Sequence, residues 1–355
     1  MPAFEIHEVV IPETVDAPDA ADFIRAIEVA TEVEAIGYGT PDLAYEPAEE
    51  LPAFRDVHHP HRMLVATVDG VIVARGVWET QADEEADSAW IIAEVLPEFR
   101  GRGIGTALAD QLEEMTREDG RSKALVYTPI PEGPGECLAA PTGVGSIVAG
   151  HRDVRFLQKR GYSFEQVERL SRLPLPVPEL DALVVAAQER SGPDYLVHTW
   201  VERTPERWLA DLAELGTRMS TDAPSAGLEE PPDVWTVERI LERDEINATQ
   251  NPRTRVVAAV EHVPSATLVG FTVLSVPVQK HRAVDQYATL VLREHRGHKL
   301  GMLLKVANLQ HLAKEFPGHP AILTFNAEEN RHMLDVNEAV GFAGIGNESA
   351  WRKDL

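Results

Sequence analysis

Two short segments of the sequence combine glycines with basic side chains, and such segments are suited to binding an anion. The first is Arg100-Gly101-Arg102-Gly103-Ile104-Gly105, and the second is Arg296-Gly297-His298-Lys299-Leu300-Gly301. Glycines let the backbone approach a ligand closely, and the free N–H groups at the start of a helix attract negative charge. Each segment therefore predicts a turn that binds phosphate or a similar anion.

The sequence around each segment predicts the elements that hold such a turn. Apolar, strand-like runs at 89–96 and 287–292 lead into the two turns. Apolar side chains three or four residues apart follow each turn, as in a helix with one buried face. The two copies align residue for residue, with Gly105 matching Gly301. A repeat of this length indicates two similar domains, because solenoid repeats are far shorter.

The length of the chain supports the same division. Its 355 residues exceed what a single hydrophobic core usually covers. A proline-rich stretch that ends at Pro178 marks a junction, and a helical pattern follows it. We therefore predict domains at residues 1–175 and 194–355, joined by a linker with a helix at 176–193.

Composition restricts the partners of the protein. The formal net charge of −25 repels nucleic acid and anionic membranes and favours a cationic small molecule or a basic peptide, unless the charge serves only solubility. The chain has no apolar run near the roughly 20 residues of a membrane span and no secretory signal at Met1 to Glu8. A single cysteine, Cys137, fits a reducing compartment. We expect a cytoplasmic protein, monomeric or homodimeric, that binds neither nucleic acid nor membrane.

Two common phosphate-binding motifs fit the turns poorly. A dinucleotide-binding turn with glycines at 101 and 103 would need a third glycine where Thr106 stands. A Walker-type loop ends in Gly-Lys-Ser/Thr, which neither copy has. An ordinary glycine-rich helix start is an alternative for one copy, but the second copy with matching flanks argues against it.

The segment from Val95 to Gly105 resembles the acyl-CoA signature of the GNAT superfamily of N-acetyltransferases, Arg/Gln-x-x-Gly-x-Gly/Ala. The second turn is similar to it except that Lys299 stands where glycine is usual. Gly161-Tyr162 and Gly341-Phe342 resemble the end of the family's last helix. The whole chain thus resembles a tandem GNAT protein of the actinobacterial type, distantly similar to mycothiol synthase.

This resemblance implies an α+β fold of two tandem GNAT domains. In each, a mixed, mostly antiparallel sheet with splayed central strands is flanked by helices. It also implies acetyl-CoA, or another acyl-CoA, as the cofactor. The residues that the resemblance assigns to the cofactor lie on and beside the two turns: Val95, Arg100, Gly101, Arg102, Gly103, Ile104, Gly105, Thr106, Val291, Arg296, Gly297, His298, Lys299, Leu300, Gly301, Asn326 and Asn330.

Candidate catalytic groups lie on the strands before the turns and near the end of the chain. They are Glu94, Asp285, Tyr287 and Asn330. The alternatives are a solvated or salt-bridged strand residue for the first three and a helix N-cap for Asn330. The tyrosine that often acts as general acid in the family is replaced by Leu157 in one half and Asn337 in the other. The second half keeps the asparagines, so the sequence slightly favours it as the catalytic half.

The predicted function is acyl-CoA-dependent N-acetyl transfer to a small-molecule amine, by direct attack of the amine on the thioester. The alternative is a catalytically silent acyl-CoA-binding protein, a sensor or scaffold, which the missing tyrosines favour. We predict no metal site, because Pro60 gives the run from His58 to His61 poor ligand geometry. The acceptor stays unidentified because the variable first helices and loops form the walls of its pocket.

Overall fold

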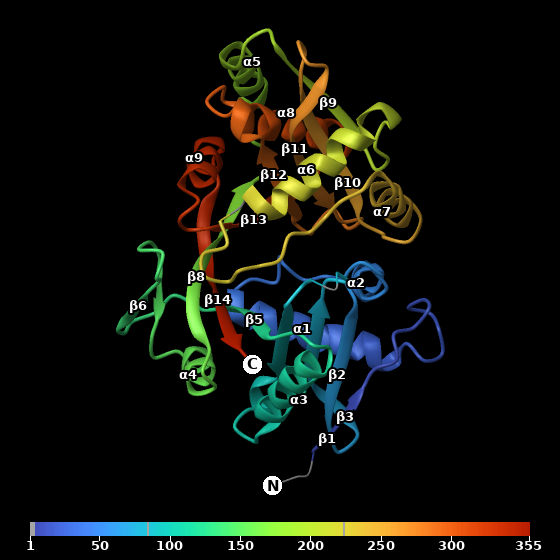
Figure 1. Ribbon diagram of the computed structural model, residues 1–355, viewed down its shortest axis with the longest axis vertical. Helices are drawn as coiled ribbons and strands as arrows, with labels where there is room; N and C mark the ends of the chain where they lie inside the picture. Colours follow the sequence, from blue (N-terminus) through green and yellow to red (C-terminus); the bar gives the residue numbers. More distant parts are fainter. Residues whose placement is uncertain (1–3, 84, 223) are drawn as a thin grey trace.

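The computed structural model describes residues 4–83, 85–222 and 224–355. Two halves with the same order of elements build one molecule around a shared sheet (Figure 1). The first half contains β1 (Phe4–Glu8), α1 (Ala21–Tyr38), α2 (Pro47–Phe54), β2 (His61–Val68), β3 (Val71–Thr80), β4 (Ser88–Val95), α3 (Ile104–Glu118), β5 (Lys123–Pro129), a small hairpin of β6 (Cys137–Ala139) and β7 (Ser146–Val148), α4 (Arg152–Lys159) and β8 (Ser163–Pro174).

The linker helix α5 (Leu180–Ser191) leads into the second half, which repeats the order of the first half without the β6–β7 hairpin. Its elements are β9 (Tyr195–Val201), α6 (Leu209–Asp222), α7 (Val237–Thr249), β10 (Thr254–His262), β11 (Thr267–Val276), β12 (Val284–Val291), α8 (Leu300–Glu315), β13 (Ala321–Ala327), α9 (Arg331–Val340) and β14 (Ala343–Asp354). Within the described ranges, no helix is both long and apolar enough to cross a membrane.

The large sheet has the order β1-β2-β3-β4-β5-β14-β8-β13-β12-β11-β10-β9. All neighbouring strands are antiparallel except β4 with β5 and β12 with β13. The parallel pairing ends early: β4 and β5 pair only from Ser88 to Trp90, and β12 and β13 only at Val284 and Asp285. Beyond these residues the strands diverge, which confirms the predicted mixed, mostly antiparallel sheet with splayed central strands.

The last strand of each half lies beside strands of the other half. β14 pairs with β5 and β8, and β8 pairs with β13 and β14, so the two final strands are exchanged (Figure 1). Glu168 and Glu348 face each other directly across the central β8–β14 pair. Burial raises the pKa of Glu168 to about 8 and that of Glu348 to about 7. The exchange makes one continuous sheet of the two halves.

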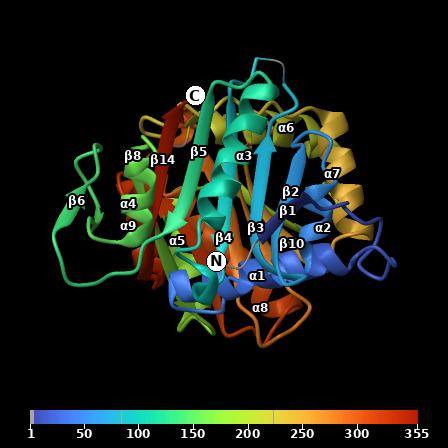
Figure 2. The same ribbon diagram turned by 90° about the horizontal axis from the view of Figure 1, so that it is seen from below.

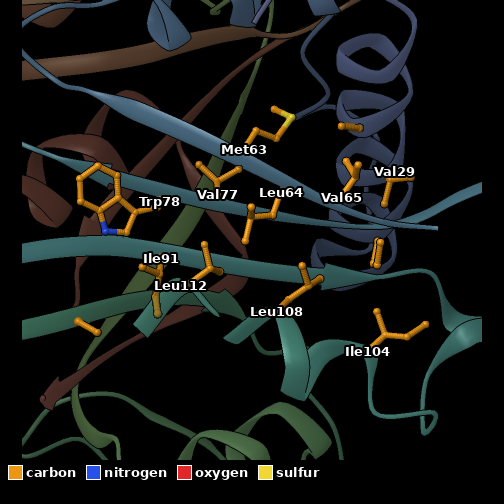
Figure 3. Packing of buried hydrophobic residues seen from close by; sticks show 14 of the residues in the cluster. Val29, Met63, Leu64, Val65, Val77, Trp78, Ile91, Ile104, Leu108 and Leu112 are labelled. Atoms are coloured by element: carbon orange, nitrogen blue, oxygen red, sulfur yellow. The ribbon is translucent and has the colours of Figure 1, made fainter. Parts of the chain in front are cut away.

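Helices cover both faces of the first-half strands. On one face, Leu108 and Leu112 of α3 pack with Leu64 of β2. On the other face, Val65 of β2 meets Val29 of α1 (Figure 3). This follows from the alternation of side chains along a strand, which sends neighbouring residues to opposite faces. Figure 2 shows α3 lying over β3 and β4. The face toward α1 therefore stays separate from the face that carries the turn and α3.

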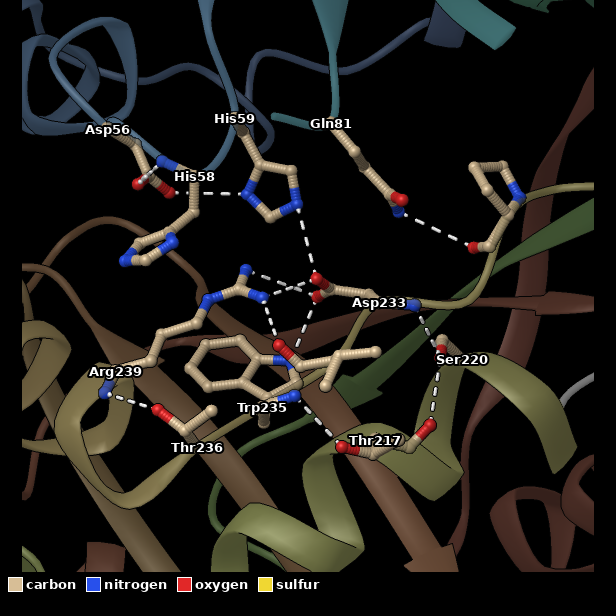
Figure 4. Close-up of polar contacts among 12 residues, drawn as sticks. Asp56, His58, His59, Gln81, Thr217, Ser220, Asp233, Trp235, Thr236 and Arg239 are labelled. Carbon is tan, nitrogen blue, oxygen red and sulfur yellow. Dashed lines mark hydrogen bonds and ion pairs between the residues drawn. The ribbon is translucent and has the colours of Figure 1, made fainter. Parts of the chain in front are cut away.

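The loops between the first two helices of each half also cross to the other half. Leu228 is fully buried against Leu125 and Ala350, and Glu230 accepts a hydrogen bond of 2.6 Å from the Tyr127 hydroxyl. His59, from the histidine-rich run, lies between Asp56 of its own half and Asp233 in the loop of the second half (Figure 4). Hydrogen bonds to these two carboxylates raise the pKa of His59 to about 9.

Candidate active site

The two glycine turns have almost the same backbone conformation. A short 3-10 turn precedes each one, and Arg100 and Arg296 follow it with ψ angles of 160° and 158°. Gly103 then adopts a left-handed φ of 89°, and Lys299 takes the equivalent position with a φ of 58°. A left-handed backbone suits glycine best, so Lys299 keeps the shape of the turn at some cost in conformational strain.

Helix α3 begins at the first turn without a side-chain cap. The first helical hydrogen bond runs from the N–H of Ala107 to the carbonyl of Gly103, at 3.0 Å. The N–H groups of residues 104–106 precede that bond and have no partner among the described residues. A Cβ atom on Gly101 or Gly103 would meet no other atom within 4 Å, so the space above the turn is open. These features fit a pyrophosphate such as that of coenzyme A.

The second turn has the same free helix start but a different charge. Asp222, at the end of α6, lies 3.2 Å from Arg293 and 3.2 Å from Arg296. In contrast, neither Arg100 nor Arg102 forms an ion pair with any described carboxylate; Arg100 instead donates to the carbonyl of Val95 at 2.7 Å. The arginines of the first turn are therefore free to meet an anion, whereas Asp222 partly neutralises those of the second turn, where Lys299 adds a positive charge.

The first turn lies beside the open edge of β4. Because the Leu96 N–H donates to the carbonyl of Val73 on β3, alternation along the strand directs the N–H of Val95 away from β3 and into the gap toward β5. Beyond Trp90, no β5 residue pairs with this edge. The structure thus supplies a backbone donor in the gap, next to the turn.

Glu94 lies on the face of β4 that is toward α1, opposite the face that α3 covers. It forms a buried ion pair with Arg75 of β3, with Oε2 at 2.7 Å from Nη2 and 2.8 Å from Nε. The two side chains are directly opposite each other in the sheet. Glu34 of α1 lies 3.9 Å from the same guanidinium. The structure thus bears out a salt bridge for Glu94, which was the alternative to a free base.

A cavity of about 280 Å³ adjoins this ion pair. Burial, followed by the nearby charge of Glu94, raises the pKa of Glu34 to about 8. Burial also raises the pKa of Glu50 on α2, whose carboxylate has no partner among the described side chains. Both carboxylates line the cavity, together with Ile27, Ala30, Thr31, Tyr38, Leu43, Tyr45, Arg75, Ile92 and Phe325.

A second hollow of about 360 Å³ lies next to the cavity and shares Ile27, Thr31 and Tyr45 with it. Its other walls include the acidic residues Glu28, Glu32 and Glu46 and the guanidinium of Arg282. A cation reaching the cavity from this side would pass three carboxylates and the two arginines that pair with them, Arg25 with Glu28 and Glu32 and Arg282 with Glu46. Such a charged approach raises the local concentration of cationic ligands.

The second half has apolar residues at the positions that correspond to the Arg75–Glu94 ion pair of the first half. Phe271 and Leu290 pair across β11 and β12 as Arg75 and Glu94 pair across β3 and β4. Both pack in a hydrophobic cluster with Met219 of α6, on the face toward that helix. The equivalent face of the second half therefore offers no carboxylate to an amine at this position.

The structure places the other predicted catalytic residues in different roles. Asp285 accepts hydrogen bonds from Tyr45 and, at 2.7 Å, from Arg253, so it anchors the first-half loop to the second half. Tyr287 lies at a bulge in β12 and is 75% exposed. Asn330 caps α9 by accepting from the N–H of Met333 at 3.3 Å, which was the alternative for this residue.

The predicted cofactor residues fall into two groups at the two turns. Residues 95 and 100–106 gather at the first turn, and residues 291 and 296–301 gather at the second. Asn326, the residue before the last of β13, accepts a hydrogen bond of 2.6 Å from the amide of Asn337 on α9, so it links that strand to that helix. Tyr162 is buried and donates to Glu113 at 3.1 Å, which makes it a packing residue.

Sequence reasoning missed Glu34, Glu50 and Arg75. The spacing of the helix already indicated the position of Glu34. This residue lies seven residues after the buried Ile27 and four before Tyr38, so the three share one face of the helix. A carboxylate on the stripe of a helix that faces the core marks a buried charge. Arg75 stands within a hydrophobic strand and carries the same kind of signal.

Residues 27–129 match the model of the acetyltransferase (GNAT) family. Over the whole chain, the structure is similar to a tandem GNAT protein from the clavulanic acid biosynthesis pathway, with a TM-score of 0.71 and 20% identity over 99% of this chain and 98% of that one. It is also similar to a GCN5-related N-acetyltransferase from Sphaerobacter thermophilus, with a TM-score of 0.61 and 15% identity over 99% and 95% of the two chains. No curated protein matches the sequence. At these identities the solved structures establish the fold.

Proposed function

We propose that this chain, a tandem protein of the GNAT fold with a GNAT-family segment in its first half, transfers an acetyl group from acetyl-CoA to the amine of a small molecule. We place the reaction in the first half. The observation that carries this choice is the buried Arg75–Glu94 pair with Glu34 beside it, which the second half replaces with Phe271, Leu290 and Met219. This choice differs from the prediction made from the sequence, which slightly favoured the second half.

The first turn and the edge of β4 account for cofactor binding in this proposal. The N–H groups of residues 104–106 would hold the pyrophosphate, and the Val95 N–H would donate to the thioester carbonyl. When bound, acetyl-CoA supplies the electrophilic carbonyl carbon and a thiolate leaving group. The chain positions the two reactants on opposite sides of the splayed strands.

Glu34 is the proposed general base. An amine is protonated near neutral pH and must lose a proton before it attacks. A carboxylate with a pKa of about 8 accepts that proton far better than one of ordinary acidity. The nitrogen then forms a bond to the acetyl carbon, and the bond from carbon to sulfur breaks. The nitrogen loses its second proton, which passes through water to the thiolate, and Glu34 returns the first proton to solvent. The products are an amide and free coenzyme A.

The direct test is release of free thiol from acetyl-CoA in the presence of a panel of primary amines. We expect release that depends on the amine, with formation of the acetylated amine confirmed by mass spectrometry. Tight binding of acetyl-CoA without release for any amine would instead support the alternative of a silent acyl-CoA-binding protein. No binding of acetyl-CoA would contradict both.

A further inference from the structure

The cavity beside α1 carries more negative charge than a single ammonium group needs. Glu94 and Glu34 lie 2.7 Å and 3.9 Å from the guanidinium of Arg75, and Glu50 lines the same cavity. The charges of Arg75 and His61 act on Glu50, but His61 is itself paired with Glu79 at 3.2 Å. Glu94 pairs with Arg75 through one oxygen, Oε2, which accepts from Nε and contacts Nη2 at short distances. Glu34 and Glu50 are the surplus, since neither has a closer cationic partner among the described residues than the 3.9 Å contact of Glu34.

Even partial burial of two carboxylates that lack close cationic partners is costly unless a cation joins them. A buried carboxylate without a partner usually becomes protonated, and the raised pKa values of Glu34 and Glu50 reflect this cost. A ligand with two positive charges would let both ionise and would recover the cost. Tyr38, Tyr45 and Phe325 also line the cavity, and the ring of Tyr45 already lies 4.6 Å from the cationic carbon of Arg253, so this wall accommodates positive charge.

The size of the cavity and its position limit the ligand further. A cavity of about 280 Å³ is at the small end for ligand pockets, so the molecule is small. Glu34 comes from α1 and lies 3.9 Å from the guanidinium of Arg75, whereas Glu50 comes from the next helix, α2, and has no ion pair among the described residues. The two carboxylates therefore occupy different positions along the cavity.

We propose that the acceptor is a small aliphatic diamine or a comparable dication. Glu34 receives the proton of the reacting ammonium, and Glu50 holds the second cationic group. Glu50 is thus a specificity residue that selects for a second charge. This inference rests on the proposed function, and it adds the class of acceptor.

The test compares 1,4-diaminobutane with n-butylamine, which has the same carbon chain and one charge fewer. We expect kcat/KM at pH 7.5 to favour the diamine by about tenfold or more, as for one buried charged contact. Glu50→Gln should reduce this ratio to within about threefold of one, and Glu50→Asp should give an intermediate ratio. Glu189→Gln, on the exposed side of α5, is the matched control and should keep the full ratio.

The outcomes separate the two proposals. Transfer to both amines with a ratio near one in the unaltered protein would overturn the diamine inference and leave the acetyltransferase proposal standing. If neither amine accepts an acetyl group, calorimetry with 1,4-diaminobutane alone decides. Binding that Glu50→Gln weakens about tenfold would support the inference, whereas no binding, or equal binding by both proteins, would overturn it. Circular dichroism confirms that each variant is folded, and Glu50→Asp carries the test if Glu50→Gln is not.

Discussion

Replacing Glu34 with glutamine is expected to lower kcat for acetyl transfer by about 10²- to 10⁴-fold, the usual contribution of a general base. Glutamine keeps the size of the side chain but cannot accept a proton. The unaltered protein should show kcat/KM that rises with pH through about 8, as Glu34 loses its proton and becomes the active base. The variant should lack this rise.

The measurement is the initial rate of thiol release from pH 6 to pH 9.5, with Glu189→Gln as the control for a surface charge. A change in KM alone, with kcat and the pH profile preserved, would show that Glu34 binds the acceptor but does not take its proton. In that case the buried Glu94, held by Arg75, would again be the candidate base, as the sequence predicted.

Replacing Lys305 with methionine should stabilise the protein by about 2–4 kcal/mol at pH 7. Lys305 lies on α8, is 2% exposed and forms no ion pair with any described carboxylate; its nearest polarisable partner is the ring of Phe342, at 5.6 Å. Burial lowers the pKa of Lys305 to about 7. Methionine has a similar length and no charge to bury.

The sign of the pH dependence follows from this lowered pKa. Between about pH 7 and the ordinary lysine value of 10.5, the unfolded chain binds a proton that the folded chain does not, so the stability of the unaltered protein rises with pH. The gain from Lys305→Met should therefore be largest at pH 7 and below and should shrink toward pH 10. Urea unfolding at pH 7 and pH 9.5 measures it.

Lys314→Met is the matched control, because Lys314 lies on the same helix but its side chain is 79% exposed. It should change the free energy of unfolding by less than about 0.5 kcal/mol at either pH. Equal gains from Lys305→Met at both pH values would show that improved packing, and not removal of a buried charge, stabilises the variant.

Local patterns in the sequence predicted the repeated parts of the fold. Glycine turns, the apolar strands before them and the amphipathic helices after them depend on neighbouring residues, and all appear where they were expected. The prediction placed no strand after Phe342, although β14 follows it. The segment from Ala343 to Asp354 is rich in glycine and charge, so it has little strand character of its own. Its pairing partners, β5 and β8, come from far earlier in the chain.

The same difference between local and distant contacts explains why only part of the site was predicted. The anion-binding turns are continuous segments, so their residues could be read together. The acceptor face instead combines α1, α2, β3 and β4 with Phe325 from the second half. Whether a carboxylate such as Glu94 is free or paired depends on Arg75, 19 residues away in the sequence. Only the register of β3 against β4 shows that pairing.

Gly105→Trp and Gly301→Trp, compared with the unaltered protein, test the central claim that the first half carries out the transfer. The two glycines are equivalent, neither has a left-handed backbone, and an added Cβ would come no closer than 3.5 Å to another atom at Gly105 or 3.8 Å at Gly301. Each tryptophan would fill the space at one turn. We predict that Gly105→Trp abolishes thiol release from acetyl-CoA with the accepted amine and that Gly301→Trp retains most of it. The reverse result would assign catalysis to the second half and contradict the account.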